Sequence, residues 1–215
     1  MLTINRDLRA RFAKARDQAQ RPTCLAFALS DAHSADRPPH PPLSADYLYY
    51  HSLQRMPKGH GDNGVGLSEA GAALAIEGQP KETAWLYSPI LPVPISKWKP
   101  PAKVKTLRAT VTTIPRDFSS ICSAIDLGKP AVIIFRPTER FYYADSAGLL
   151  PHRHPDPNIP QLHAVVALGH GKSASHRYLL IRNSWGGSWG QNGYAWLAED
   201  YLSLRLSSVT SVQTS

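Results

Sequence analysis

The sequence is poor in the features that mark secreted scaffolds and membrane proteins. It has 2 cysteines among 215 residues, so at most one disulfide can form and a disulfide-built scaffold is excluded. No apolar run approaches the roughly 20 residues that a membrane helix needs. The longest runs, 131–135 and 164–168, have the length of strands. We therefore expect no membrane span.

The N-terminal residues also lack an apolar stretch followed by small residues at a cleavage site, the pattern of a classical secretory signal. We therefore leave the location open between the cytoplasm and export by a non-classical secretion route.

Acidic residues are few, 16 against 24 lysines and arginines, which gives a net charge of +8. The basic residues are densest at 6–21 and 97–108, and neither stretch carries the row of aromatic residues on which bases stack. Nucleic acid is therefore not an expected partner. With 42% hydrophobic and 19% charged residues the composition is that of a folded globular chain, not a disordered one.

The local patterns predict helices first and strands second. Helices are expected at 24–33 with Thr23 as N-cap, from Ser44 through Leu53, and at 67–77 ended by Gly78. The five prolines of 88–101 indicate an extended crossing between two halves. After it come a helix at 117–127, a loop at 150–162, and strands at 131–136, 163–169, 178–183 and 194–197. This order predicts an α+β fold.

Three segments carry residue types used in nucleophilic catalysis. Cys24 begins a predicted helix, where the helix dipole favours the thiolate, and Gln18 lies six residues before it. His163 opens a strand, and Asn183 follows one. Taken singly, these are a core cysteine, a boundary histidine and a turn asparagine. Their order and their local contexts together indicate a thiol active site.

These segments resemble the papain family of cysteine peptidases. The resemblance rests on Gln18 with Cys24-Leu-Ala-Phe, on His163-Ala-Val, and on Asn183-Ser-Trp-Gly continuing to Asn-Gly-Tyr194. It implies one papain-like domain over 1–215, with a helical lobe at about 15–100, a β-barrel-like lobe at about 101–215, and the active-site cleft between them.

The resemblance also implies roles for the residues. Cys24 would be the nucleophile, His163 its base, and Asn183 the residue that orients the imidazole. Gln18 and the Cys24 backbone N–H would form the oxyanion hole. Gln20 competes with Gln18 for this role, but the family's glutamine lies six positions before the cysteine, which favours Gln18.

Substrate binding is implied for a further group of residues. The family's glycine-rich strand, which pairs with the substrate backbone, would be Gly64, Val65 and Gly66, although a flexible loop is the plain alternative for this segment. Ala164 would form a wall of the main specificity pocket. Trp185 would cover the contact between His163 and Asn183.

The sequence departs from the family just before the nucleophile. Arg21, Pro22 and Thr23 stand where the family has a further cysteine and glycines, and Leu25 replaces a tryptophan. The missing cysteines mean missing disulfides, as in a bacterial-type member or a reducing environment. Only 23 residues precede Cys24, which leaves no room for the long inhibitory pro-segment typical of the family. We therefore expect either a mature fragment or an activity restrained by location or by a partner.

The expected function is hydrolysis of peptide bonds in a protein or peptide substrate through an acyl-enzyme. The alternatives are acyl transfer or deamidation with the same residues, and a non-catalytic basic binding module. An inhibitor or a chaperone is the other partner considered, and we expect a monomer. No cofactor or metal is expected, because His152, His154 and His170 lack the spacing of metal ligands. Cys122 is expected to be a buried, inert thiol.

Overall fold

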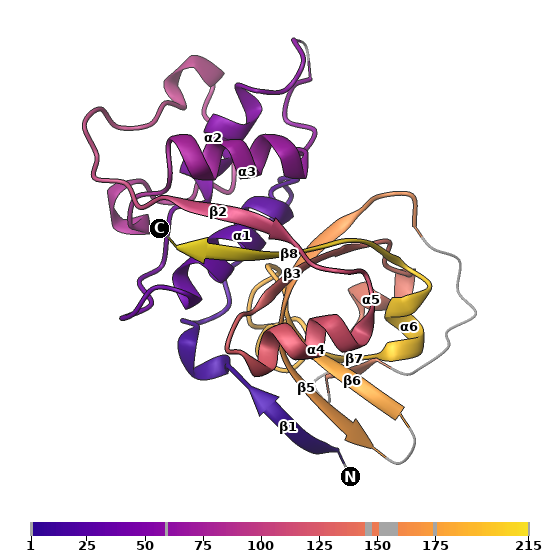
Figure 1. Ribbon diagram of the computed structural model, residues 1–215. Coiled ribbons are helices and arrows are strands. Elements are labelled where there is room, and N and C mark those ends of the chain that lie inside the picture. Colours follow the sequence, from indigo (N-terminus) through magenta and orange to yellow (C-terminus); the bar gives the residue numbers. More distant parts are fainter. Residues whose placement is uncertain (1, 59, 145–147, 151–158, 174–175, 215) are drawn as a thin grey trace.

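A computed structural model describes residues 2–58, 60–144, 148–150, 159–173 and 176–214. The chain has an α+β fold, as predicted. Three helices come early in the chain: α1 (Cys24–Ala35), α2 (Ala45–Leu53) and α3 (Leu67–Ile76). Most of the sheet follows, together with the helices α4 (Phe118–Asp126), α5 (Glu139–Tyr142) and α6 (Glu199–Ser203) (Figure 1). Short 3-10 helices lie at Arg9–Arg11, Glu82–Ala84 and Ile95–Lys97.

One mixed sheet joins the strands of the described residues in the order β2-β8-β3-β5-β6-β7-β4, with β1 paired to the far end of β5. The pairs are antiparallel except for β4 with β7. The strands are β1 (Thr3–Asp7), β2 (Ala109–Thr113), β3 (Ala131–Phe135), β4 (Leu149–Leu150), β5 (His163–Ser173), β6 (His176–Arg182), β7 (Tyr194–Ala198) and β8 (Leu206–Thr214).

The four predicted helices are confirmed to within two residues at each end. Ser44 caps α2 by accepting the Tyr47 N–H at 3.1 Å. Gly78 adopts a φ of 70° just beyond α3, which a residue with a side chain avoids. The prediction that the Thr23 side chain caps α1 is wrong. Thr23 precedes α1 but makes no capping bond, because its hydroxyl pairs instead with the Tyr87 hydroxyl at 3.0 Å.

The four predicted strands are confirmed as β3, β5, β6 and β7, whereas β1, β2, β4 and β8 were not predicted. Strand β4 has two residues and includes Leu150 of the predicted loop at 150–162, of which 151–158 lie outside the described residues. Strands β1, β2 and β8 are polar: β1 reads Thr-Ile-Asn-Arg-Asp and is exposed throughout. Backbone pairing holds these strands in the sheet: β1 pairs with β5, and β8 pairs with β2 and β3. Because their side chains are mostly polar, their sequences show no alternating apolar pattern. The division into lobes near residue 100 stays a prediction.

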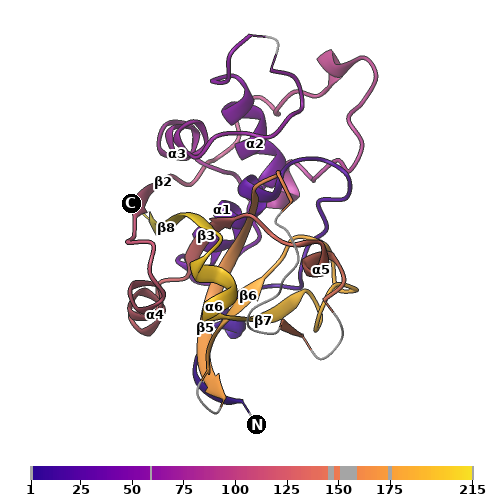
Figure 2. The ribbon, with the colours of Figure 1, turned by 90° about the vertical axis from the view of Figure 1, so that its right-hand side faces the viewer.

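Helix α1 is the central element of the packing. Eleven of its twelve residues are buried, and it contacts β3, β5 and β8 on one side and α2 and α3 on the other. Strands β3 and β5 also contact α4, and consecutive buried residues at Ala131–Ile133 show that both faces of β3 are covered. Figures 1 and 2 show α1 between the α2–α3 pair and the sheet. No helix in the described part of the chain is long and apolar enough to cross a membrane.

A buried carboxylate ties α1 to the sheet. Asp31 accepts from Arg182 Nε at 2.7 Å and from Arg16 Nη2 at 2.6 Å. Arg182, at the end of β6, also donates to the carbonyls of Ala13 and Lys14. Burial by itself raises the pKa of Asp31, but the charges of the two arginines outweigh it and hold this pKa below its ordinary value.

Asp31→Asn should lower the free energy of unfolding by about 3 kcal/mol, because it leaves the buried Arg182 without its counter-charge and leaves Arg16 with Glu82 alone. Urea unfolding at pH 7 measures this. Since the folded pKa of Asp31 is depressed, the stabilisation is present above the ordinary carboxyl pKa and is lost as the pH falls below it. The difference between the two proteins should therefore shrink below about pH 4.

The matched control is Asp7→Asn, which breaks the exposed pair of Asp7 with Arg9 and should cost no more than about 1 kcal/mol. Equal losses in the two variants would contradict a special role for Asp31.

Candidate active site

Cys24 is the first residue of α1 and is half-buried at the side of a cleft. Burial raises the pKa of its thiol, and this effect exceeds the opposing effect of nearby backbone N–H groups, that of Ala164 first among them. The contact with the Ala164 N–H brings the thiol beside the residue that follows His163. The N-terminus of α1 and the first residues of β5 therefore meet at the sulfur.

His163 and Asn183 are brought together by neighbouring strands. His163 is the first residue of β5, Asn183 directly follows β6, and the two strands pair in antiparallel register. His163 Nε2 lies 2.8 Å from Asn183 Oδ1. The same oxygen accepts the Ser184 backbone N–H at 2.8 Å, which identifies it as the acceptor. His163 Nε2 therefore carries the proton, and Nδ1 of the neutral ring keeps its lone pair.

Aromatic side chains enclose this histidine. The Trp185 ring packs on the His163 ring with centroids 4.6 Å apart, and Phe141 adds an edge contact at 5.7 Å. Tyr142 stacks on Trp185 at 4.9 Å. Burial lowers the pKa of His163 to about 4, although the hydrogen bond to Asn183 works in the opposite direction. Trp185, which we expected to cover the His163–Asn183 contact, thus packs directly on the imidazole ring.

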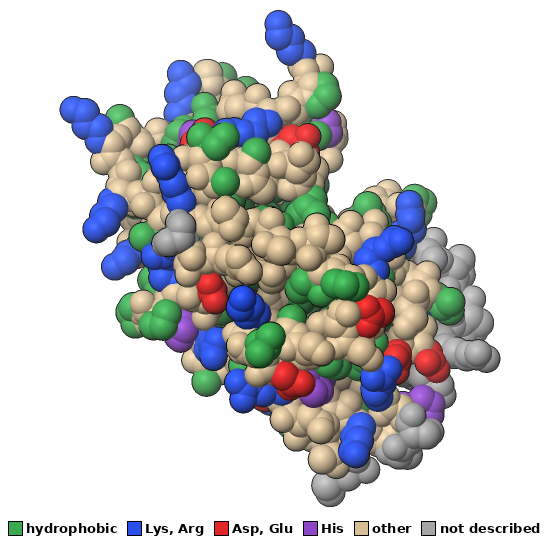
Figure 3. Space-filling view, viewed as in Figure 1, with side chains coloured by type: hydrophobic (Ala, Val, Ile, Leu, Met, Phe, Trp, Pro, Cys, Tyr) green, Lys and Arg blue, Asp and Glu red, His purple; other side chains and the backbone are tan. Residues whose placement is uncertain are grey.

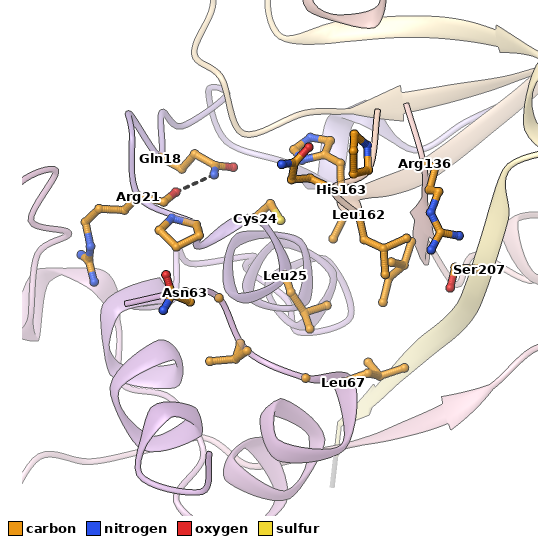
Figure 4. A pocket seen from close by; sticks show the side chains of 18 of the residues that line it. Gln18, Arg21, Cys24, Leu25, Asn63, Leu67, Arg136, Leu162, His163 and Ser207 are labelled. Atoms are coloured by element: carbon orange, nitrogen blue, oxygen red, sulfur yellow. Dashed lines mark hydrogen bonds between the residues drawn. The ribbon is translucent and has the colours of Figure 1, made fainter. Parts of the chain in front are cut away.

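The side-chain amide of Gln18 is held at both ends. Its oxygen accepts the Ser184 hydroxyl at 2.6 Å, and its nitrogen donates to the Arg21 carbonyl at 2.7 Å (Figure 4). Its backbone N–H donates to the Ser184 carbonyl at 2.8 Å. One amide hydrogen remains beyond these bonds. The competing Gln20 also lines the cleft but is exposed.

Arg21, one of the departures from the family pattern, is buried with its guanidinium directed away from the cleft (Figure 4). It forms an ion pair with the fully buried Asp46 at 2.6 Å and donates to the Ser88 carbonyl at 2.7 Å. The guanidinium lies over the Trp98 ring at 5.0 Å and the Tyr87 ring at 5.1 Å. This cluster anchors the loop that precedes Cys24.

The same arginine reaches the glycine-rich segment through a chain of contacts. Arg21 Nε lies 3.6 Å from Asp62 Oδ2, and Asp62 Oδ1 accepts the Tyr49 hydroxyl at 2.6 Å. The Tyr49 oxygen in turn accepts the Gly64 N–H at 3.1 Å, and the Gly64 carbonyl is bound by His60 Nε2 at 2.8 Å. Hydrogen bonds therefore fix both the N–H and the carbonyl of Gly64, which argues against a flexible loop at this segment.

A cleft of about 1340 Å³ collects these groups. Figure 3 shows the molecule notched between the part that carries α2 and α3 and the part that carries α5 and α6. The residues predicted from the sequence that line the cleft are Gln18, Cys24, Gly64, Val65, Gly66, His163, Ala164 and Trp185. Asn183 does not line it and lies buried behind His163.

Several lining residues were not predicted, among them Leu67, Ile134, Arg136, Tyr142, Ser207 and Ser208. A signal for two of them was present. Ile134 and Arg136 are two residues apart at the end of a predicted strand, so they share one face. Which face meets the cleft depends on the pairing of β3 with β5 and β8, and β8 was not predicted.

The two thiols differ in their surroundings. Cys122 lies on α4, as predicted, but is half-buried rather than buried, and burial raises its pKa to about 11. Within the described residues no three histidine, cysteine or acidic side chains gather as a metal site would need. His170 pairs with Asp126 at 2.7 Å, and His152 and His154 lie outside the described residues.

The fold and the sequence are both similar to those of known cysteine proteases. The family model of the papain family of cysteine proteases matches residues 91–212, more than half of the chain. Pro-cathepsin H of Mus musculus is 31% identical over 101 residues, which cover 46% of this chain and 29% of that protein. Papaya proteinase 4 of Carica papaya is 62% identical over 32 residues, covering 15% and 9%.

Two solved structures show the same architecture. Xylellain, a cysteine protease from Xylella fastidiosa, superposes with a TM-score of 0.78 at 21% identity, covering 100% of this chain and 87% of that one. The bromelain protease from Ananas comosus, in complex with the E64 inhibitor, gives 0.70 at 20% identity, covering 97% and 98%. The chain belongs to the papain family of cysteine proteases. Its matched stretches span less than a third of the length of those two sequence relatives.

Proposed function

We propose that this chain is a thiol endopeptidase that hydrolyses peptide bonds through an acyl-enzyme on Cys24. The observation that carries the proposal is the His163–Asn183 hydrogen bond beside the Cys24 thiol, on an open cleft. Asn183 fixes the imidazole so that Nδ1 is the free acceptor, which is the group that a thiol nucleophile needs as its base.

The proton balance of the two groups suits this role. Burial lowers the pKa of His163 to about 4 and raises the pKa of the Cys24 thiol. At a pH between these two pKa values, the Cys24–His163 pair holds one proton in total, either on the sulfur or on the imidazole. The charged form, thiolate with imidazolium, is neutral as a whole, so burial opposes it less than it opposes either charge alone.

The reaction then follows from the positions of these groups. His163 Nδ1 takes the thiol proton, and the sulfur forms a bond to the substrate carbonyl carbon. The tetrahedral intermediate collapses with loss of the C–N bond, and the imidazolium returns its proton to the departing amine. Water, deprotonated by His163, attacks the thioester, releases the carboxylic acid and restores the thiol.

We assign two donors to the oxyanion of the intermediate. One is the Cys24 backbone N–H at the N-terminus of α1, and the other is the remaining amide hydrogen of Gln18. Ser184 supports the second donor, because its hydroxyl and its carbonyl both bind Gln18. Ser184 directly follows Asn183, so the segment that orients the base also orients the oxyanion donor.

We assign the substrate backbone to the Gly64–Gly66 segment, with Ala164 across the cleft. The described part of the chain offers the Gly66 N–H no acceptor, so this group is free to bond an extended peptide by strand addition. Gly64 is fixed through Tyr49 and His60, which keeps the edge of the segment in place.

The test is a quenched fluorescent peptide library under reducing conditions, with products identified by mass. The wild-type chain and Cys122→Ser should both cleave peptides at internal bonds with uptake of water, whereas Cys24→Ala should not. An epoxysuccinyl inhibitor should label Cys24 and not Cys122. Ammonia release without chain cleavage would indicate a deamidase. No turnover and no labelling of Cys24 would contradict the proposal.

Alanine variants of the two glutamines test which of them belongs to the oxyanion hole. Gln18→Ala should lower kcat by about 10²- to 10³-fold, because one preorganised donor is lost at the point where negative charge develops. Gln20→Ala should change kcat by less than about threefold, since its exposed side chain is free to move. Kinetics on one cleaved peptide measure both. A large loss in Gln20→Ala alone would overturn the assignment.

A further inference from the structure

We propose that the cleft selects an acidic residue on the acyl side of the substrate, through the guanidinium of Arg136 at the end of an apolar side pocket. This inference rests on the proposed peptidase function. Ala164, beside His163, and Arg136 both line the cleft, and Figure 4 shows Arg136 beside Ser207 on the opposite side of it from Gln18. The group that it would take is the carboxylate of a glutamate or aspartate side chain.

The floor of this pocket is a row of residues across three strands. Ile134 on β3 lies opposite Ala164 on β5 and opposite Ser208 on β8. Side chains two apart on a strand share a face, so Arg136 continues the face of Ile134 beyond the end of β3. Leu67 and Leu162 add apolar side chains to the lining. The pocket therefore changes from apolar near Cys24 to cationic at Arg136.

The Arg136 guanidinium has no partner among the residues that the structure describes. It points toward the cavity near Ser207 (Figure 4). Among the described residues, the side chain of Arg136 makes no ion pair and no hydrogen bond, although its backbone N–H donates to the Arg205 carbonyl at 3.1 Å. A cation without a counter-charge, set beside two serines that also line the cleft, suits a carboxylate that accepts several hydrogen bonds.

No carboxylate of the cleft occupies that place. Among the lining residues Asp17 alone carries a carboxyl group. Asp17 lies beside Trp185 and Gly186, and its Oδ1 accepts the Ala19 N–H at 2.8 Å. Arg21, the other arginine of the lining, is already paired with Asp46. Arg136 is therefore the unpaired arginine that a bound peptide would meet, and the methylenes of a glutamate would lie along Ile134.

The first test uses peptides that differ at one residue. Glutamate, its neutral isostere glutamine, or leucine is placed in turn at each of the three positions before a bond that the wild-type chain cleaves. At one position glutamate should exceed glutamine by at least about tenfold in kcat/KM. Arg136→Gln should bring this ratio close to one, and Arg136→Glu should bring it below one. The control Lys172→Gln, an equal charge change on β5 outside the cleft lining, should keep the ratio.

The second test does not need turnover. Binding of the same peptides to Cys24→Ala, measured by fluorescence anisotropy, should show at least tenfold tighter binding of the glutamate peptide, and Arg136→Gln in that background should remove the difference. Cleavage without any glutamate preference, or equal binding of the glutamate and glutamine peptides, would overturn the inference and leave the peptidase proposal standing. If the chain binds the glutamate peptide selectively but cleaves no peptide, the peptidase proposal is contradicted and the inference about Arg136 stands.

Discussion

The position of the thiol depends on one buried ion pair, that of Asp31 with Arg182. Asp31 lies on the helix that begins with Cys24, and Arg182 directly precedes Asn183. The pair therefore connects the element that carries the candidate nucleophile with the strand end that delivers the partner of His163. Since buried ion pairs add little net stability but penalise every arrangement that separates them, its main effect is to hold α1 at one register against the sheet.

A second buried arginine performs a similar task at the entrance of the cleft. Arg21 joins the loop before Cys24 to α2 through Asp46 and to the Gly64 segment through Asp62 and Tyr49. Charge and hydrogen bonds thus make a connection without a disulfide. With only two cysteines in the chain, both free, the structure holds the cleft without any oxidised thiol.

The sequence predicted the α+β fold and the residues that now lie together at Cys24, because these depend on local patterns: a helix start, buried strands, and a glycine-rich turn after Asn183. It did not predict β8, whose polar strand is held by pairing with β2 and β3. Without β8, the cleft face of β3 was unknown, and Arg136 could not be assigned to the pocket. The bond of Gln18 to Ser184 and the ion pair of Arg21 with Asp46 were not predicted either, because each joins segments far apart in the chain.

The most direct measurement of the central claim, a thiol activated by His163, is the alkylation rate of Cys24 by iodoacetamide as a function of pH, with Cys122 as the internal reference. In the wild-type chain the rate at Cys24 should reach a plateau across neutral pH and exceed that at Cys122, whose pKa is raised to about 11. In His163→Ala the rate at pH 7 should fall about 100-fold and recover only at alkaline pH, as for an isolated thiol. An unchanged profile in His163→Ala, or equal rates at the two cysteines, would contradict the account.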